Sequence, residues 1–197
     1  VDVIIVGGGL AGLSCARHLN ANGISFKLLE GAPQVGGRIQ TDVLKGFQLD
    51  RGFQVLLTAY PEAQSCLSYS NLDLKEFMTG ALVRVNGRFH EVRDPWREPA
   101  TALKSAFSPV GTLMDKLKLA TLRKQALDFK LSDDDAALNA SAREYLHALG
   151  FSQSMMVRFL EPFFRGVFLE PDLETTCRKL LFTFQMFSLG KAAIPSK

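Results

Sequence analysis

Three glycines near the start of the chain, Gly7, Gly9 and Gly12, constrain its fold more than any other feature. They follow a short apolar run, residues 1–6, that we predict as a buried parallel strand, and they precede apolar residues at helical spacing over 10–22. Gly7 permits a tight turn, Gly9 lets a phosphate approach the backbone, and Gly12 lets the helix pack on the strand. The pattern predicts a strand, turn and helix that bind a dinucleotide pyrophosphate at the helix N-terminus.

An acidic residue supports this prediction. Residues 24–30 are predicted as a second strand, which makes a βαβ unit with the expected right-handed crossover. Glu30 ends that strand, 18 residues after Gly12, where an acid accepts hydrogen bonds from an adenosine ribose. A carboxylate at this position repels a 2′-phosphate, so the site disfavours NADP.

A second glycine pair, Gly36-Gly37, follows six residues after Glu30 and is joined to Arg38. The glycines allow close backbone approach, and a guanidinium suits the oxygens of a pyrophosphate. The alternative is an ordinary surface turn with a solvated arginine. The position of the Gly36-Gly37-Arg38 segment, shortly after Glu30, favours the binding interpretation.

The predicted secondary structure of the remaining chain changes near Pro95, from loops and short strands to helices. Before it, we predict a loop-rich stretch over 31–46, one or two short strands in 47–57 and a short helix in 61–68. Asn86-Gly87 suits a two-residue type I′ turn, so residues 81–92 are predicted as a β-hairpin. Residues 99–190 have helical periodicity.

Helix boundaries can be placed within this second half. Residues 141–144 match a capping box, Gly150 closes the helix that follows, and Ser152 caps the next helix, which runs toward Glu161-Pro162. The acidic run 133–135 supplies negative charge to a helix N-terminus, with a metal site as the alternative interpretation.

Composition narrows the functional classes. A net charge of +3 argues against a nucleic-acid partner. Cys15, Cys66 and Cys177 are too scattered for a disulfide framework or a zinc site, and no metal is expected. No apolar run reaches the roughly 18 residues of a membrane span. We expect an intracellular protein of the cytoplasm or of an organelle such as the plastid.

The motifs together resemble a known family. The segments 6–14, 29–30 and 36–38 resemble the flavin amine oxidase superfamily, which includes protoporphyrinogen oxidases and phytoene-desaturase-like enzymes. Residues 46–54 resemble the segment that runs beside the flavin in this family, and 149–169 resembles its helical part. The resemblance implies FAD bound in an extended conformation, with its adenine at the Glu30 end.

The resemblance also implies site residues and domains. The cofactor-binding residues would be Gly7, Gly9, Leu10, Ala11, Gly12, Glu30, Gly36, Gly37, Arg38, Gly52, Phe53 and Gln54. Arg51, where many relatives have a small or apolar residue, would meet a flavin edge or a surface carboxylate. The fold class implied is α/β. Residues 1–95 would form the N-terminal part of a Rossmann-like FAD-binding domain with a small β-hairpin, and 96–197 an incomplete, mainly helical substrate domain. Because members are usually much longer, we expect a fragment or a truncated form.

The implied function is an FAD-dependent oxidoreductase that transfers a hydride from a C–H bond of an organic, apolar substrate to the flavin. The alternatives are an NAD-linked dehydrogenase and a truncated, non-catalytic dinucleotide-binding module. No catalytic residue stands out, since His18, His90 and His147 are scattered. Eight of the fifteen phenylalanines lie in 151–187. They indicate either core packing or an apolar tunnel or peripheral membrane contact.

Overall fold

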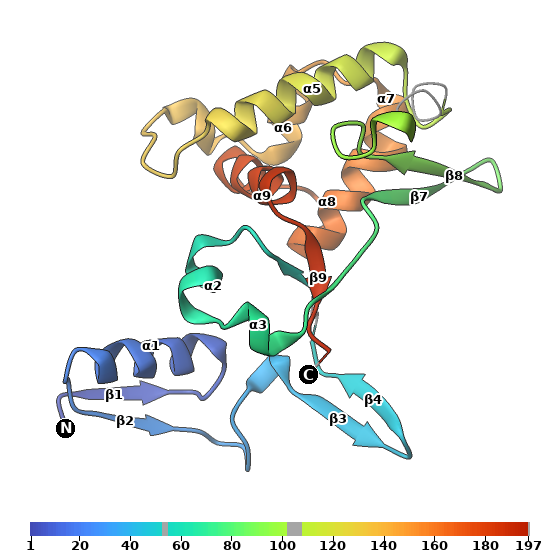
Figure 1. The fold of residues 1–197 in the computed structure, drawn as a ribbon. Helices are drawn as coiled ribbons and strands as arrows, with labels where there is room; N and C mark the ends of the chain where they lie inside the picture. The colour runs from blue at the N-terminus through green and yellow to red at the C-terminus, as the bar shows by residue number, and fades with distance from the viewer. Residues whose placement is uncertain (53–54, 102–107, 197) are drawn as a thin grey trace. The chain divides into compact units, whose positions relative to one another are not determined.

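The structure is a computed structural model that describes residues 1–52, 55–101 and 108–196 (Figure 1). The chain separates into two compact units. Unit 1 comprises Val1–Leu56, Pro61–Lys75 and Ala193–Lys197, and unit 2 comprises Leu57–Tyr60 and Glu76–Ala192.

Unit 1 begins with the predicted strand, helix and strand. Strand β1 (Val3–Val6), helix α1 (Leu10–Ala21) and strand β2 (Phe26–Leu29) follow in this order, and the two strands pair in parallel. Both strands are shorter than predicted. Ile5 is buried on the side where α1 packs, whereas Ile4 and Val6 are 63% and 84% exposed. Parallel strands are normally covered on both faces, and here the described residues cover only one.

An antiparallel hairpin, which we did not predict from the sequence, follows β2. Strand β3 (Thr41–Leu44) pairs antiparallel with β4 (Phe47–Asp50), although residues 31–46 were predicted as loop. The turn between them places Lys45 and Gly46 at φ values of 51° and 84°. Two positive φ values in succession are typical of a type I′ hairpin turn. The stretch predicted as loop-rich, 31–46, therefore contains a strand that was not predicted, whereas β4 lies within 47–57, where short strands were predicted.

Short elements complete the connections. The 3₁₀ turn η1 (Gly37–Ile39) precedes β3, and helices α2 (Pro61–Cys66) and α3 (Tyr69–Leu72) follow β4 in unit 1. The Arg17 guanidinium of α1 donates to the backbone carbonyls of Ser65 and Cys66 at the end of α2. The two-residue strands β5 (Leu56–Leu57) and β6 (Lys75–Glu76) flank β9 (Ala192–Ile194) in a three-stranded sheet.

The predicted hairpin around Asn86-Gly87 is confirmed and belongs to unit 2. Strands β7 (Gly80–Val85) and β8 (Arg88–Arg93) pair antiparallel, and the turn residues have φ values of 51° and 79°. Val83 and Val85 are buried in the same core as the helices. The compact units therefore do not divide at residue 95, and the assignment of domains to 1–95 and 96–197 stays a prediction.

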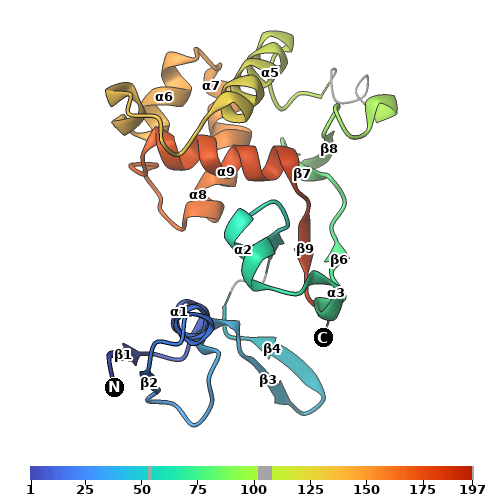
Figure 2. The same cartoon turned by 60° about the vertical axis from the view of Figure 1, so that its left-hand side comes forward.

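Unit 2 is mainly helical, as predicted. Its helical elements are η2 (Pro99–Thr101), α5 (Leu113–Asp128), η3 (Ala136–Asn139), α6 (Ala142–Ala148), α7 (Gln153–Met155), the π-helical turn η4 (Met156–Leu160), α8 (Glu161–Phe168) and α9 (Cys177–Leu189). Ring contacts join α8 to α9, which lie side by side in Figures 1 and 2. Fully buried side chains, including Leu122, Phe164 and Leu180, form one continuous core.

The predicted caps are confirmed, with one correction. Ser141 and Glu144 form a reciprocal capping box, and Ser152 accepts from the Met155 N–H. Gly150 has a φ of 74°, suited to the end of α6. The helix after Ser152 does not stop at Pro162, because a π turn over 156–160 precedes the proline. The wider turn accommodates a residue that lacks an N–H, and the helix continues to Phe168.

A buried carboxylate ties the start of α5 to the start of α7. Asp115 is 1% exposed and accepts hydrogen bonds of 2.7 Å from the backbone N–H and the hydroxyl of both Thr112 and Ser152. Burial alone would raise the pKa of Asp115, but these hydrogen bonds outweigh it and bring the pKa to about 2. Asp115 is therefore a fixed negative charge.

Candidate functional site

The glycine turn of unit 1 has the geometry that its sequence predicts. Gly7 leaves β1 with a φ of 100°, a conformation that L side chains rarely adopt. A Cβ built on Gly12 would lie 1.9 Å from the carbonyl oxygen of Gly7 and 3.3 Å from Cγ2 of Ile5. Gly12 is therefore needed for α1 to pack against the end of β1.

Open space lies beside the same turn. Among the described residues outside the immediate chain neighbours, no heavy atom lies within 4 Å of a Cβ built on Gly7 or on Gly9. Gly9 is the N-cap residue of α1, so no side chain caps the helix, and its first turn holds no acid. The first N–H groups of a helix have no intrahelical partner, and they carry the positive end of the helix dipole. Leu10 and Ala11 stand in this turn, which presents backbone donors to an anion.

Glu30 is held in place beside this turn. One carboxylate oxygen accepts from the Gly8 N–H at 2.6 Å, and the other accepts from the Ala32 N–H at 2.8 Å. The hydrogen bonds from Ala32 and Gly8 lower the pKa of Glu30, so the group is ionised at neutral pH. Each carboxylate oxygen has further lone pairs, which leaves Glu30 able to accept hydrogen bonds from hydroxyl groups.

The second glycine pair lies against the first. The Gly36 N–H donates to the Gly8 carbonyl at 2.7 Å, and Gly36 forms a parallel bridge with Gly9. Gly36 and Gly37 have φ values of 121° and 56°, and a Cβ on Gly37 would lie 3.4 Å from Cα of Gly9. The structure thus joins two motifs that are more than 20 residues apart in the sequence.

Part of the third predicted segment, residues 46–54, also contacts the glycine motifs. A Cβ on Gly52 would lie 2.6 Å from the carbonyl oxygen of Arg38, so Gly52 packs directly on the second motif. Phe53 and Gln54 lie outside the described residues. Arg51 pairs with the surface carboxylate Asp42 through two hydrogen bonds of 2.7 Å, in agreement with the second of its two predicted roles.

Gly8 is a further candidate site residue, which we did not predict from the sequence. Its N–H orients Glu30, its carbonyl accepts from Gly36, and a Cβ would lie 2.9 Å from Val35 and 3.0 Å from Glu30. The signal was the uninterrupted run Gly7-Gly8-Gly9, of which the motif explains only the outer two. Gly8 links the predicted site residues to one another.

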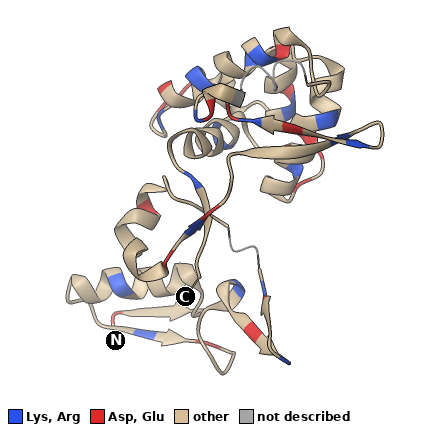
Figure 3. Cartoon of the chain, turned by 45° about the vertical axis from the view of Figure 1, so that its right-hand side comes forward, with Lys and Arg blue, Asp and Glu red and all other residues tan. Residues whose placement is uncertain are grey.

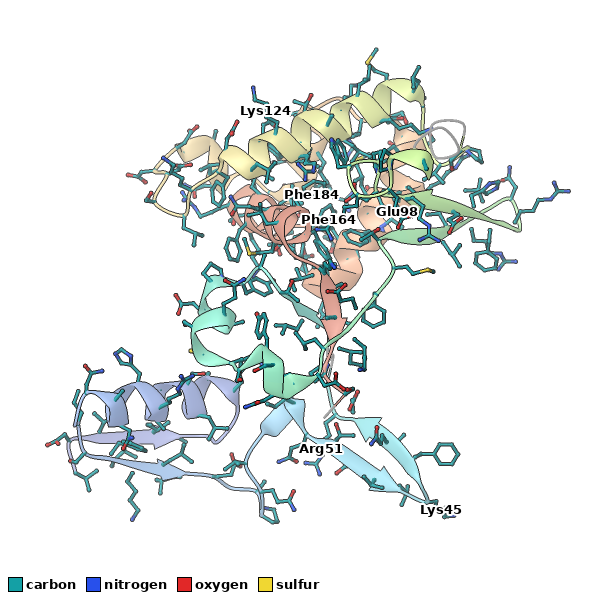
Figure 4. The ribbon with its side chains drawn as sticks, in the orientation of Figure 1. Lys45, Arg51, Glu98, Lys124, Phe164 and Phe184 are labelled. Atoms are coloured by element: carbon teal, nitrogen blue, oxygen red, sulfur yellow. The ribbon has the colours of Figure 1, made fainter. Side chains whose placement is uncertain are left out.

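Unit 2 contains an apolar cavity of about 240 Å³. The rings of Phe159, Phe163, Phe164, Phe184 and Phe187 line it together with Trp96. These phenylalanines also contact one another, with centroid distances of 5.1 to 6.4 Å. Figure 4 shows Phe164 and Phe184 close together between α8 and α9. The phenylalanine-rich segment therefore packs the core and also forms one wall of a cavity.

Comparison with known proteins gives the family. The model of the family described as flavin containing amine oxidoreductase matches residues 10–193. The chain belongs to this family. The family is thus one of flavin-containing proteins. The mixture of helices and strands in this chain agrees with the fold of solved oxidoreductase structures.

Individual proteins are similar to this chain in sequence or in fold. The chain is 27% identical to carotenoid phi-ring synthase from Streptomyces griseus, over 96% of this chain and 39% of that protein. An oxidoreductase from Methanosarcina mazei superposes with a TM-score of 0.66 at 20% identity, over 99% of this chain and 45% of that one. Putrescine oxidase bound to putrescine superposes with a TM-score of 0.65 at 19% identity, over 98% and 46%. This chain spans less than half of the length of each of these three.

Two further findings concern the described residues alone. No helix among them is long and apolar enough to cross a membrane, and no three of their His, Cys, Asp or Glu side chains form a metal-binding group. The acidic run 133–135 instead supports local structure, because Asp135 accepts from the Ala137 N–H and caps η3. Figure 3 shows acidic and basic residues interspersed over the helices of unit 2.

Proposed function

We propose that unit 1 binds the ADP half of FAD in the manner of a Rossmann-like βαβ unit. Gly7, Gly9 and the first turn of α1 would receive the pyrophosphate, and Glu30 would accept hydrogen bonds from the adenosine ribose. The observation that carries the proposal is the open space at Gly9, which adjoins free helix N–H donors and an oriented carboxylate. Backbone donors in a first helical turn that itself holds no acidic residue suit a pyrophosphate dianion.

The second glycine pair favours FAD over a nicotinamide cofactor. Gly36 and Gly37 lie against the phosphate turn and carry Arg38, a cation that would meet the pyrophosphate from the other side. Family membership supports the flavin independently. The NAD-linked alternative explains Glu30 and Gly12 equally well, but it gives no role to the second pair.

We propose that the protein is an FAD-dependent oxidoreductase acting on a C–H bond of an organic, apolar substrate. A bound flavin would supply the acceptor for a hydride equivalent, and the protein would bind and orient the substrate and exclude water. The aromatic cavity of unit 2 supports an apolar substrate, and so does the likeness to an enzyme named for a carotenoid. No described residue is assigned as a general base. Dinucleotide binding without turnover is the second candidate, because the candidate site described in unit 1 consists of backbone donors and an acceptor carboxylate.

Titration of the purified 197-residue chain with FAD tests the binding proposal. We expect saturable quenching of flavin fluorescence, with weaker binding of FMN, which lacks the adenosine that Glu30 would hold. NAD⁺ and NADP⁺ serve as competitors. Displacement of FAD by NAD⁺ at comparable concentration would favour the NAD-linked alternative, and absence of FAD binding would refute the assignment of unit 1.

A further inference from the structure

One basic side chain of the aromatic cavity is not explained by the proposed function. Three arginines line the cavity: Arg93, Arg97 and Arg123. Guanidinium groups next to an apolar cavity are costly unless they are paired. The partners of each therefore decide which charge the cavity presents to a ligand.

Two of these arginines are neutralised locally. Arg93 pairs with Glu91 and Glu98, and Nε of Arg93 lies 2.6 Å from the Glu91 carboxylate. Arg97 lies 3.5 Å from the Asp94 carboxylate. Arg97 also donates to the backbone carbonyls of Phe187, Ser188 and Gly190, which closes the C-terminal end of α9.

Arg123 differs from both. Its guanidinium lies over the ring of Trp96, with Cζ 5.0 Å from the ring centroid, and it makes one long hydrogen bond of 3.4 Å to the Ser188 carbonyl. That carbonyl already accepts from Arg97. No carboxylate in the described part of the chain forms an ion pair with Arg123. Most of its five N–H donors are thus available at the cavity wall.

We propose that this cavity binds an apolar molecule with a terminal carboxylate, whose acid group pairs with Arg123. The inference rests on the proposed function, because it takes the aromatic cavity as the substrate-binding site. The planar guanidinium that lies over the ring of Trp96 has N–H donors in a fixed geometry, which suits bidentate binding of a carboxylate. The same cation repels an alkylammonium group. The aromatic walls take the hydrocarbon part.

The size of the cavity selects suitable probes. At the roughly 30 Å³ that a water molecule occupies in the liquid, about 240 Å³ holds roughly eight water-sized groups. Octanoate, octan-1-ol and octylammonium therefore form a matched set that differs only in the polar end. Trp96 is the only tryptophan of the chain and lines the cavity, so its emission reports binding at this site.

The test is a titration of the 197-residue chain with each probe, by calorimetry and by Trp96 emission, without FAD. Octanoate should bind most tightly, then octanol, and octylammonium most weakly. Arg123→Gln should weaken octanoate binding by about tenfold or more and leave octanol unchanged, because a hydrogen bond to a charged group is typically worth that factor. Arg123→Lys should restore part of the preference.

Lys124→Gln is the matched control. Lys124 is the next residue of α5, carries the same charge, is exposed and lies outside the cavity lining (Figure 4). It should leave all three affinities unchanged. Equal affinity for octanoate and octanol, tighter binding of octylammonium, an Arg123→Gln variant that weakens octanol as much as octanoate, or no binding of any probe would each overturn the proposal. FAD binding is measured by flavin fluorescence, whereas probe binding is measured without FAD by calorimetry and Trp96 emission. Failure of this proposal and failure of FAD binding are therefore separate results.

Discussion

The open space beside Gly9 predicts that a single added methyl group weakens cofactor binding and leaves the stability of the fold almost unchanged. Gly9 has φ and ψ of −77° and −176°, which alanine adopts without strain, and a Cβ there would have no atom of another described residue within 4 Å, its chain neighbours aside. Gly9→Ala should therefore change the free energy of unfolding by no more than about 1 kcal/mol, mainly because alanine is a poorer N-cap residue than glycine. The methyl group would lie where the pyrophosphate is proposed to approach.

The expected loss of FAD affinity follows from that overlap. Inserting a methyl group into a close-packed contact typically costs about 1–3 kcal/mol, which corresponds to a Kd about 5 to 150 times larger. Flavin fluorescence titration measures the Kd, and thermal unfolding followed by circular dichroism measures stability. Gly12→Ala should instead lower the thermal stability, since its Cβ would lie 1.9 Å from the Gly7 carbonyl oxygen and would disturb the fold of the turn itself.

Gly166→Ala is the control for the glycine-to-alanine change. Gly166 lies on α8 in unit 2, is exposed and also has no heavy atom within 4 Å of a built Cβ. It should leave FAD affinity unchanged. A Gly9→Ala protein that binds FAD within twofold of the unaltered chain would refute the placement of the pyrophosphate at α1.

Three further changes test other parts of the argument. Glu30→Gln should lower FAD affinity by about tenfold and FMN affinity little, because an ionised acceptor is lost. In the unaltered chain, FAD affinity should fall only below pH 4.5, the ordinary carboxyl pKa, because hydrogen bonds lower the pKa of Glu30. A Glu30→Gln variant that binds FAD as tightly as the unaltered chain would contradict the role of Glu30. Asp115→Asn should cost about 2 kcal/mol of unfolding free energy at pH 7, from the difference between 3.8 and about 2 in pKa. Because the folded-state pKa is depressed, this contribution is complete above pH 3.8 and is lost as the pH falls toward 2. Urea unfolding at several pH values checks this, with exposed Asp134→Asn as the control, and a constant difference down to pH 2 would contradict it. Phe164→Ala should cost about 3–5 kcal/mol in the same assay, since Phe164 is 0% exposed, and a cost below 1 kcal/mol would show that the aromatic cluster repacks freely.

The sequence predicted those elements whose residues act locally. The glycine turn at 7–12, the Asn86-Gly87 hairpin and the capping box at 141–144 each depend on neighbours within a few positions. Strand β3 was missed because it has four exposed residues and no apolar alternation, so only the Lys45-Gly46 turn marks it. The π turn before Pro162 was missed because a proline was interpreted as the end of a helix.

The contacts that the sequence could not give are those between distant segments. Asp115 accepts from Ser152, 37 residues later, and Gly36 joins Gly8 across the whole of α1 and β2. Glu30 was predicted from spacing alone, but its two backbone donors depend on how the loop after β2 folds back. Likewise, the number of phenylalanines indicated an aromatic cluster, whereas the contact between Arg123 and Trp96 exists only in the folded unit.

The end of α9 has a consequence for local unfolding. Arg97 donates to the carbonyls of Phe187, Ser188 and Gly190, so a residue from the segment after β8 replaces the water or backbone partners that a helix end usually has. The last turn of α9 cannot open without releasing Arg97 from its place. Amide hydrogens at the end of α9 and in the 94–97 turn should therefore exchange with solvent together, as one cooperative unit, despite the 90 residues that separate them in the sequence.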